Sequence, residues 1–119
     1  MRKSGFDPRW GRMDLVNKKC VPCEGGVPPL TDREIENYLS QVKDWEVLED
    51  RKIRKNFTFK NFKQAVEFVN KIAGLAEEEN HHPDIEIKYN KVRLELWTHA
   101  IGGLSENDFI LAAKIDELY

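Results

Sequence analysis

Hydrophobic residues recur along residues 31–119 at two spacings, and each spacing predicts a different kind of element. Recurrence about every three to four residues is typical of an amphipathic helix, and strict alternation is typical of a strand with one buried face. Helical spacing begins after Thr31, after Asn61 and after Ser105, and alternation marks four shorter segments. The predicted order of elements is therefore α-β-β-α-β-β-α.

Residues that cap helices stand where the helical segments begin. Thr31 and Glu34 have the spacing of a capping box, and Asn61 is followed three residues later by Gln64. Pro83 prevents the middle helix from continuing past residue 80 or so. The apolar stripe of that helix, which we expect to face a sheet, consists of Phe62, Ala65, Val66, Val69, Ile72, Ala73 and Ala76.

The alternating segments are Trp45–Val47, Ile53–Phe59, Asp84–Tyr89 and Val92–Thr98. Paired strands with short links, separated by helices, predict an α+β fold. We expect a four-stranded antiparallel sheet that the helices cover on one face. Its uncovered face and its edge favour self-association, because an exposed edge presents unpaired backbone groups.

The last two strands are predicted to form a hairpin that brings histidines together. Asn90-Lys91 lies between the strands, and asparagine tolerates the left-handed backbone of a tight turn. A turn of these two residues pairs Tyr89 with Val92 and sets His82 opposite His99. The Cβ atoms of such cross-strand neighbours lie about 5 Å apart.

Side chains of opposite character alternate along the second strand of this hairpin. One face should carry Val92, Leu94, Leu96 and Thr98, and the other should carry Arg93, Glu95, Trp97 and His99. The alternation therefore places His99 on the polar face and not in the core. Trp97 belongs either to an interface or to the wall of a ligand site.

The three histidines, His81, His82 and His99, all lie within residues 81–99. Histidine is the side chain best suited to moving protons near neutral pH, so their convergence predicts an acid–base site. A metal site is the alternative. However, adjacent residues on an extended chain point in opposite directions, and the spacing lacks the pattern of common zinc sites. We expect no bound metal.

Acidic residues on both sides of the hairpin have two interpretations each. Asp108 completes a capping box with Ser105, and it also stands at a helix start that we expect to face the histidines. Glu77, Glu78 and Glu79 form either a solvated helix end or part of the site. Acids at a helix C-terminus oppose the helix dipole, which favours a role in the site for one of them.

Composition limits the class of protein. A formal net charge of −2 and a pI near 5.9 argue against direct nucleic-acid binding, which requires a basic face. No apolar run approaches the roughly 18 residues of a membrane span, and the N-terminus lacks the apolar segment of a secretory signal. We expect a cytoplasmic protein without a membrane partner.

Residues 1–30 lack a periodic apolar face and are rich in proline, so we expect a loop-like N-terminal extension before a single domain at 31–119. Cys20 and Cys23 form one Cys-x-x-Cys pair, which is half of a zinc knuckle. A metal or redox role and a plain tail both remain open, although the following Gly25-Gly26 favours a loop.

The residues around the histidines resemble the pterin-4a-carbinolamine dehydratase family. The resemblance covers about residues 31–119, and the stretch Cys20–Pro29 is similar to an N-terminal stretch of some bacterial members. The motifs that carry it are Glu77–Asn80, His81-His82-Pro83, Tyr89–Val92, Thr98-His99, Gly103–Ser105 and Asp108.

This resemblance implies a small α+β enzyme that removes water from 4a-hydroxytetrahydropterin to give quinonoid dihydropterin. The reaction recycles the cofactor of aromatic amino acid hydroxylases, which implies a functional link to such an enzyme. The pterin is the substrate, and neither a separate cofactor nor a metal is implied. Family members form homodimers or homotetramers. The alternative is a dimerisation or regulatory module that acts as a transcriptional cofactor.

The resemblance also implies roles for individual residues. His81 and His99 are expected to exchange protons, His82 to hold the pterin, and Asp108 to orient His99. Together these are the expected catalytic residues. The residues expected to bind substrate are Glu77, His82, Pro83 and Trp45.

Overall fold

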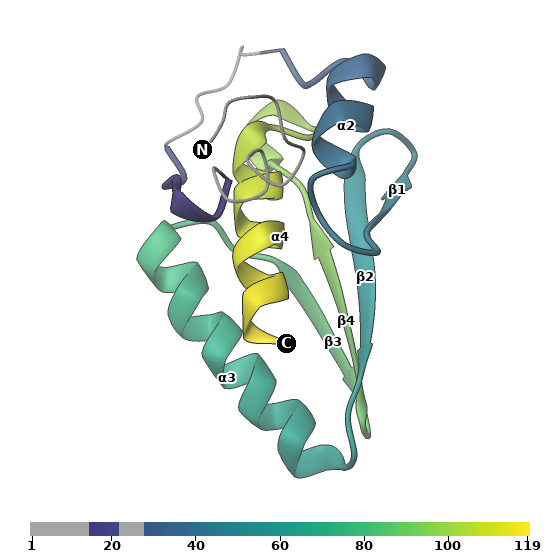
Figure 1. Ribbon diagram of the computed structural model, residues 1–119, viewed down its shortest axis with the longest axis vertical. Coiled ribbons are helices and arrows are strands. Elements are labelled where there is room, and N and C mark those ends of the chain that lie inside the picture. Colours follow the sequence, from purple (N-terminus) through teal and green to yellow (C-terminus); the bar gives the residue numbers. More distant parts are fainter. Residues whose placement is uncertain (1–14, 22–27) are drawn as a thin grey trace, which may run out of the picture.

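The computed structural model describes residues 15–21 and 28–119 (Figure 1). The described elements follow the predicted order, with two additions, the 3-10 helix η1 and a helical turn at residues 15–17. They are α2 (Asp32–Leu39), β1 (Glu46–Leu48), β2 (Lys52–Thr58), α3 (Phe62–Glu79), β3 (Asp84–Lys88), β4 (Lys91–Leu96), η1 (His99–Ile101) and α4 (Glu106–Leu118).

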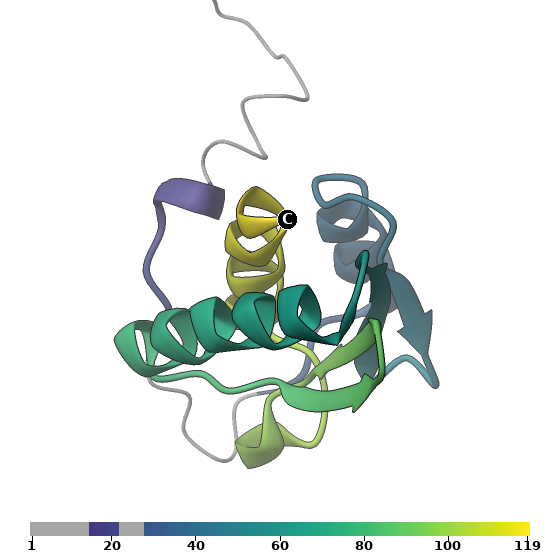
Figure 2. The ribbon, with the colours of Figure 1, turned by 90° about the horizontal axis from the view of Figure 1, so that it is seen from below.

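The four strands form an antiparallel sheet in the order β1-β2-β4-β3. Helices α2, α3 and α4 lie on one side of it, as Figure 2 shows. The predicted α+β fold, with a four-stranded antiparallel sheet covered on one face, is therefore confirmed. The core between the layers includes Ile53 and Phe57 of β2, Val92, Leu94 and Leu96 of β4, and Ile72 of α3.

The predicted caps form where the sequence places them. The Thr31 side chain accepts a hydrogen bond from the backbone of Glu34, and the side chain of Asn61 accepts one from Gln64. At its other end, α3 stops at Asn80, which takes the left-handed conformation with φ of 53°. The chain then turns back, and the His81 N–H donates to Ala76 O.

The hairpin register differs from the prediction. Lys88 pairs with Lys91, so the turn consists of Tyr89 and Asn90. Tyr89 takes the left-handed φ of 53°, while Asn90 donates its side-chain N–H to the carbonyl of Phe59 at 2.8 Å. The expected Tyr89–Val92 pair is therefore wrong, because the Asn90 amide binds the carbonyl of Phe59, the residue that follows β2.

The strand that carries His99 also ends earlier than predicted. β4 stops at Leu96, Thr98 forms an isolated bridge with Gly103, and His99 begins η1. The expected cross-strand pair of His82 and His99 is consequently absent from the sheet. The predicted faces nevertheless hold, since Val92, Leu94, Leu96 and Thr98 are all buried.

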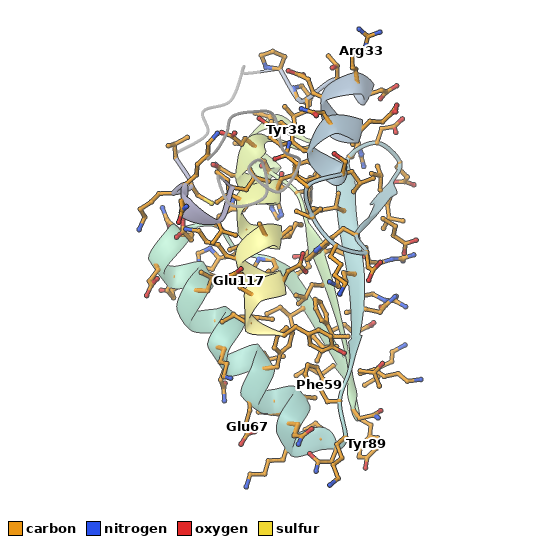
Figure 3. All side chains as sticks on the ribbon, viewed as in Figure 1. Arg33, Tyr38, Phe59, Glu67, Tyr89 and Glu117 are labelled. Atoms are coloured by element: carbon orange, nitrogen blue, oxygen red, sulfur yellow. The ribbon has the colours of Figure 1, made fainter. Side chains whose placement is uncertain are left out.

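An aromatic cluster fills the space between α3 and the sheet at the end where α3 begins. It consists of Phe57, Phe59, Phe68 and Tyr119, with ring centroids 4.9 to 5.8 Å apart. Figure 3 shows Phe59 in this layer and Tyr89 at the hairpin tip below it. The histidines follow the opposite end of α3, so this cluster stabilises the scaffold at a distance from them.

The N-terminal extension is not entirely loop-like. Residues 15–17 are helical, and Leu15 is only 1% exposed because it packs into the core. The expectation of a loop that adds little to the core is thus wrong for this part. The rest of the expected extension, residues 1–14 and 22–27 with Cys23, lies outside the described residues. The predicted boundary at residue 31 stays a prediction.

Candidate active site

A pocket of about 380 Å³ opens beside the histidines. All three histidines reach it, although they come from two places, the segment after α3 and the start of η1. The predicted convergence therefore holds despite the different register. The lining residues are Val21, Asn80, His81, His82, Trp97, Thr98, His99, Ala100 and Asn107.

His81 is held by a buried carboxylate. Its Nε2 lies 2.6 Å from Oδ1 of Asp108, whose side chain is 0% exposed. The imidazole itself is mostly buried, with 12% of it exposed, at the boundary between the core and the pocket. Because Nε2 is occupied, Nδ1 is the ring nitrogen left for a bound molecule.

Asp108 acts both as a helix cap and as a partner for the site. Its Oδ2 accepts the Ser105 N–H at 3.0 Å and the Thr98 hydroxyl at 2.8 Å. The expectation that Asp108 orients His99 is wrong, because its described histidine partner is His81. The two interpretations that the sequence left open, a helix cap and a carboxylate of the site, are compatible. Oδ2 caps α4, while Oδ1 contacts His81.

Within the described part of the chain, the ring of His99 has an aromatic and not an acidic partner. Its ring lies against Trp97, with centroids 4.0 Å apart and planes inclined by 32°. The Trp97 indole donates to Asp84 Oδ2 at 3.3 Å, and the Lys52 ammonium lies 5.2 Å from the indole centroid. Of the two interpretations of Trp97, the structure favours a pocket wall, which also supports the His99 ring.

His82 and Glu77 form an exposed pair at the mouth of the pocket. His82 Nε2 lies 2.7 Å from Glu77 Oε2, and both side chains are more than half exposed. Glu77 is absent from the pocket lining and reaches the site only through His82. An exposed pair of this kind contributes little to stability, so it is free to rearrange when a ligand binds.

Two of the residues expected to bind substrate lie elsewhere. Trp45 is buried in the core, where its indole donates to Asp116 at 3.0 Å, and it is not among the lining residues of the pocket. Pro83 is half-buried and also outside the lining. Trp45 therefore shapes the core, and Pro83 ends the turn that aims His81 and His82.

Two pocket-lining residues, Asn107 and Val21, carry no signal in the sequence that points to a role in the site. Asn107 precedes Asp108 on α4, and nothing in its local pattern distinguishes it from a surface residue. Nothing in the acidic run Glu77–Glu79 distinguishes Glu79 either, although it is the one of the three that is buried. The one available signal for Glu79 was the cost of placing acids at a helix C-terminus.

Glu79 is charged and fixed by two elements. It accepts hydrogen bonds from Lys114 at 2.6 Å and from the Cys20 N–H at 2.9 Å. Burial alone would raise the pKa of Glu79, but these partners outweigh it and lower the pKa. Burial and the same carboxylate raise the pKa of the Cys20 thiol to about 12, which disfavours the thiolate at neutral pH.

Within residues 15–21 and 28–119, no group of three or more histidine, cysteine or acidic side chains is arranged to hold a metal ion. The same part of the chain contains no helix long and apolar enough to cross a membrane. The polar side chains that line the pocket are three imidazoles, the Thr98 hydroxyl, the amides of Asn80 and Asn107, and the Trp97 indole.

The chain resembles curated proteins along most of its length. The sequence model described as Pterin 4 alpha carbinolamine dehydratase matches residues 28–118. A Nitrosomonas eutropha protein, named as a candidate pterin-4-alpha-carbinolamine dehydratase, is 54% identical over 105 residues, covering 88% of this chain and 93% of the relative. A Rubrobacter xylanophilus protein of the same name is 48% identical over 105 residues, covering 88% and 98%.

Solved structures agree with these sequence matches. A crystal structure from Brucella melitensis, described as a transcriptional coactivator/pterin dehydratase, has a TM-score of 0.72 at 33% identity, covering 76% of this chain and 97% of that one. A pterin dehydratase-like protein, described as a RuBisCO assembly factor in the alpha-carboxysome, has a TM-score of 0.55 at 27% identity, covering 63% and 88%. The fold, the histidine pocket and these matches together make the chain a member of the pterin 4 alpha carbinolamine dehydratase family.

Proposed function

We propose that this protein removes water from a 4a-hydroxytetrahydropterin to give a quinonoid dihydropterin, by histidine general acid–base catalysis. The observation that carries the proposal is the His81–Asp108 pair, which presents a carboxylate-supported imidazole to a pocket of about 380 Å³. A pocket of that volume falls in the range of small-molecule sites.

The reaction requires one proton to be given and one to be taken. The C4a–O bond breaks, and its electron pair leaves with the oxygen, which takes a proton and departs as water. The N5 lone pair forms the new double bond to C4a, and N5 then loses its proton to a base. Hydroxide is a poor leaving group, so protonation as the bond breaks is the step where a positioned acid helps most.

The geometry favours a division of these two tasks. Asp108 stabilises a positive charge on His81, so His81 suits the role of the acid that protonates the leaving oxygen. Among the described residues, no carboxylate contacts the His99 ring, which stacks on Trp97 instead. His99 is therefore better suited to accept the N5 proton, and exposed His82 to hold the pterin.

The proposal includes no cofactor besides the pterin substrate and includes a functional link to an aromatic amino acid hydroxylase. It also includes a homodimer or homotetramer. Strand β3 supports self-association, because it is an outer strand of the sheet and its Ile85 is exposed. Sedimentation of the purified protein measures the oligomeric state independently of activity.

The direct test is dehydration of a synthetic 4a-carbinolamine, followed by absorbance. Replacement of His81 or His99 by Ala should mainly lower kcat, by about 10²- to 10⁴-fold, whereas His82→Ala should mainly raise KM. Each single variant should keep residual activity because water still transfers protons slowly, and the His81→Ala/His99→Ala double variant should lose far more. Wild-type kinetics in all three single variants would contradict the catalytic proposal.

The same assay distinguishes the alternative of a regulatory module. The Brucella relative is described as both a coactivator and a dehydratase, so one fold can carry either description. A wild-type protein that binds no pterin and does not accelerate dehydration would favour the regulatory alternative, which a pulldown with a His81→Ala protein would then explore.

A further inference from the structure

Residues 15–21 form a strap that runs from the core to the pocket. At one end Leu15 is buried in the core, and at the other end Val21 lines the pocket. In Figures 1 and 2 this segment lies beside α4 and the final turns of α3. The strap lies before residue 28, where the match to the family model begins.

Asn107 fastens the pocket end of the strap through backbone contacts. Its Oδ1 accepts the Val21 N–H at 3.0 Å, and its Nδ2 donates to the Val21 carbonyl. The side-chain amide of Asn107 therefore both accepts from and donates to the backbone of Val21, like the paired hydrogen bonds between two antiparallel strands. Asn107 is itself buried, so loss of its side chain would leave backbone groups of Val21 without these partners.

Glu79 fastens the preceding residue. Its Oε1 accepts the Cys20 N–H, while its Oε2 accepts the Lys114 ammonium at 2.6 Å. The Cys20 thiol also contacts the carbonyl of Asn107, with Sγ and O separated by 3.5 Å. The strap is thus attached to two helices next to site residues. Asn107 precedes Asp108 on α4, and Glu79 ends α3 two residues before His81.

Val21 supplies an apolar surface to a pocket whose other walls are mostly polar. Its side chain is 64% exposed even though its backbone is fixed. An exposed apolar side chain held in a fixed place gains free energy when a ligand covers it. It carries no group that can transfer a proton, so any contribution must come from binding.

We infer that the strap is a wall of the substrate site, with Val21 in contact with the pterin and Asn107 and Glu79 as positioning residues. This inference rests on the proposed function, since it assigns a further binding residue to the same pocket. The substrate chemistry that fits is a flat heterocycle, whose face packs against Val21 while its polar edge faces the histidines.

The test compares Val21→Ala and Asn107→Ala with the control Asn61→Ala in the full-length protein. Asn61 caps α3 at the end away from the pocket, so its loss lowers stability without touching the site. We expect KM for the 4a-carbinolamine to rise about 3- to 10-fold in Val21→Ala, as for the loss of one or two partly buried methyl groups. Asn107→Ala should raise KM at least as much, with kcat nearly unchanged in both.

A second measurement is independent of turnover. Amide hydrogen exchange of the Cys20 and Val21 N–H groups should be slow in the wild type and accelerate in Asn107→Ala, and a pterin product should slow it further in the wild type. If the wild type turns over the 4a-carbinolamine and neither variant changes KM, the inference about the strap is overturned while the proposed function stands. A wild type without turnover or pterin binding would overturn the proposed function and, with it, the role of the strap in binding substrate.

Discussion

Replacement of Asp108 by Asn tests the proton chemistry with little change of shape. The backbone N–H of Ser105 donates to one oxygen of Asp108, so the amide oxygen of Asn must occupy that position. The amide NH₂ then takes the place of the other oxygen, 2.6 Å from His81 Nε2. Nε2 must consequently accept a hydrogen bond, which drives the ring proton to Nδ1 and opposes the imidazolium.

The expected result follows from these contacts. The variant loses a buried, charge-assisted hydrogen bond, which costs about 1.5–3 kcal/mol of unfolding free energy. The cap to Ser105 persists, so the protein should still fold. Because neutral imidazole is a far weaker acid, kcat should fall about 10²- to 10⁴-fold, with KM within a few-fold of the wild type. Urea denaturation and the carbinolamine assay measure the two effects separately.

Asp116 offers a matched control. It is also a partly buried carboxylate on α4, and it accepts hydrogen bonds from Trp45 at 3.0 Å and Lys55 at 2.7 Å. Asp116→Asn should therefore lower stability to a similar extent while the folded protein keeps its kcat. If Asp108→Asn retains full kcat, or if both variants lose activity only in proportion to unfolding, Asp108 is only a helix cap and the assignment of His81 as the acid fails.

Three further results are expected. Leu15→Ala should lower the unfolding free energy by about 2–5 kcal/mol in urea denaturation, as for other buried leucines; no change would show that the strap is not docked in solution. Glu79 has a pKa below its ordinary value of 4.5, so its stabilisation is present above that pH and is lost as pH falls through the folded-state pKa. Glu79→Gln should accordingly flatten stability below about pH 4.5, whereas curves parallel to the wild type would contradict this. Finally, dialysis against a strong chelator should leave dehydratase activity intact, and loss that zinc restores would show a metal requirement.

Local signals account for the elements that the sequence predicted correctly. The helices begin where a capping residue precedes an apolar stripe, and each cap acts within about one turn of chain. Thr31 and Asn61 each bond to a backbone N–H three residues ahead, so neighbouring sequence contains the information. The buried face of β4 follows in the same way from alternation, because the pleat alone decides which side chains share a face.

The hairpin register could not be obtained from that alternation. The predicted and observed pairings differ by two residues, so both place Ile85 and Ile87 on the same face as Val92 and Leu94. The hydrophobic pattern distinguishes only shifts of one residue. What decides between the two is the contact of Asn90 with Phe59, the residue that follows β2, and this contact belongs to tertiary structure.

The strap and the partner of Asp108 escaped prediction for a related reason. Leu15 is one apolar residue in a segment without periodicity, and only the space left between the helices shows that it is buried. The pairing of Asp108 with His99 is what the family resemblance implies, and neither the resemblance nor the alternation shows where β4 ends. Since β4 ends at Leu96 and Thr98 pairs with Gly103, His99 turns onto Trp97 and the carboxylate meets His81 instead. The acid and the base of the proposed reaction are therefore distinguished by where one strand ends, which depends on long-range pairing and not on the histidine motif itself.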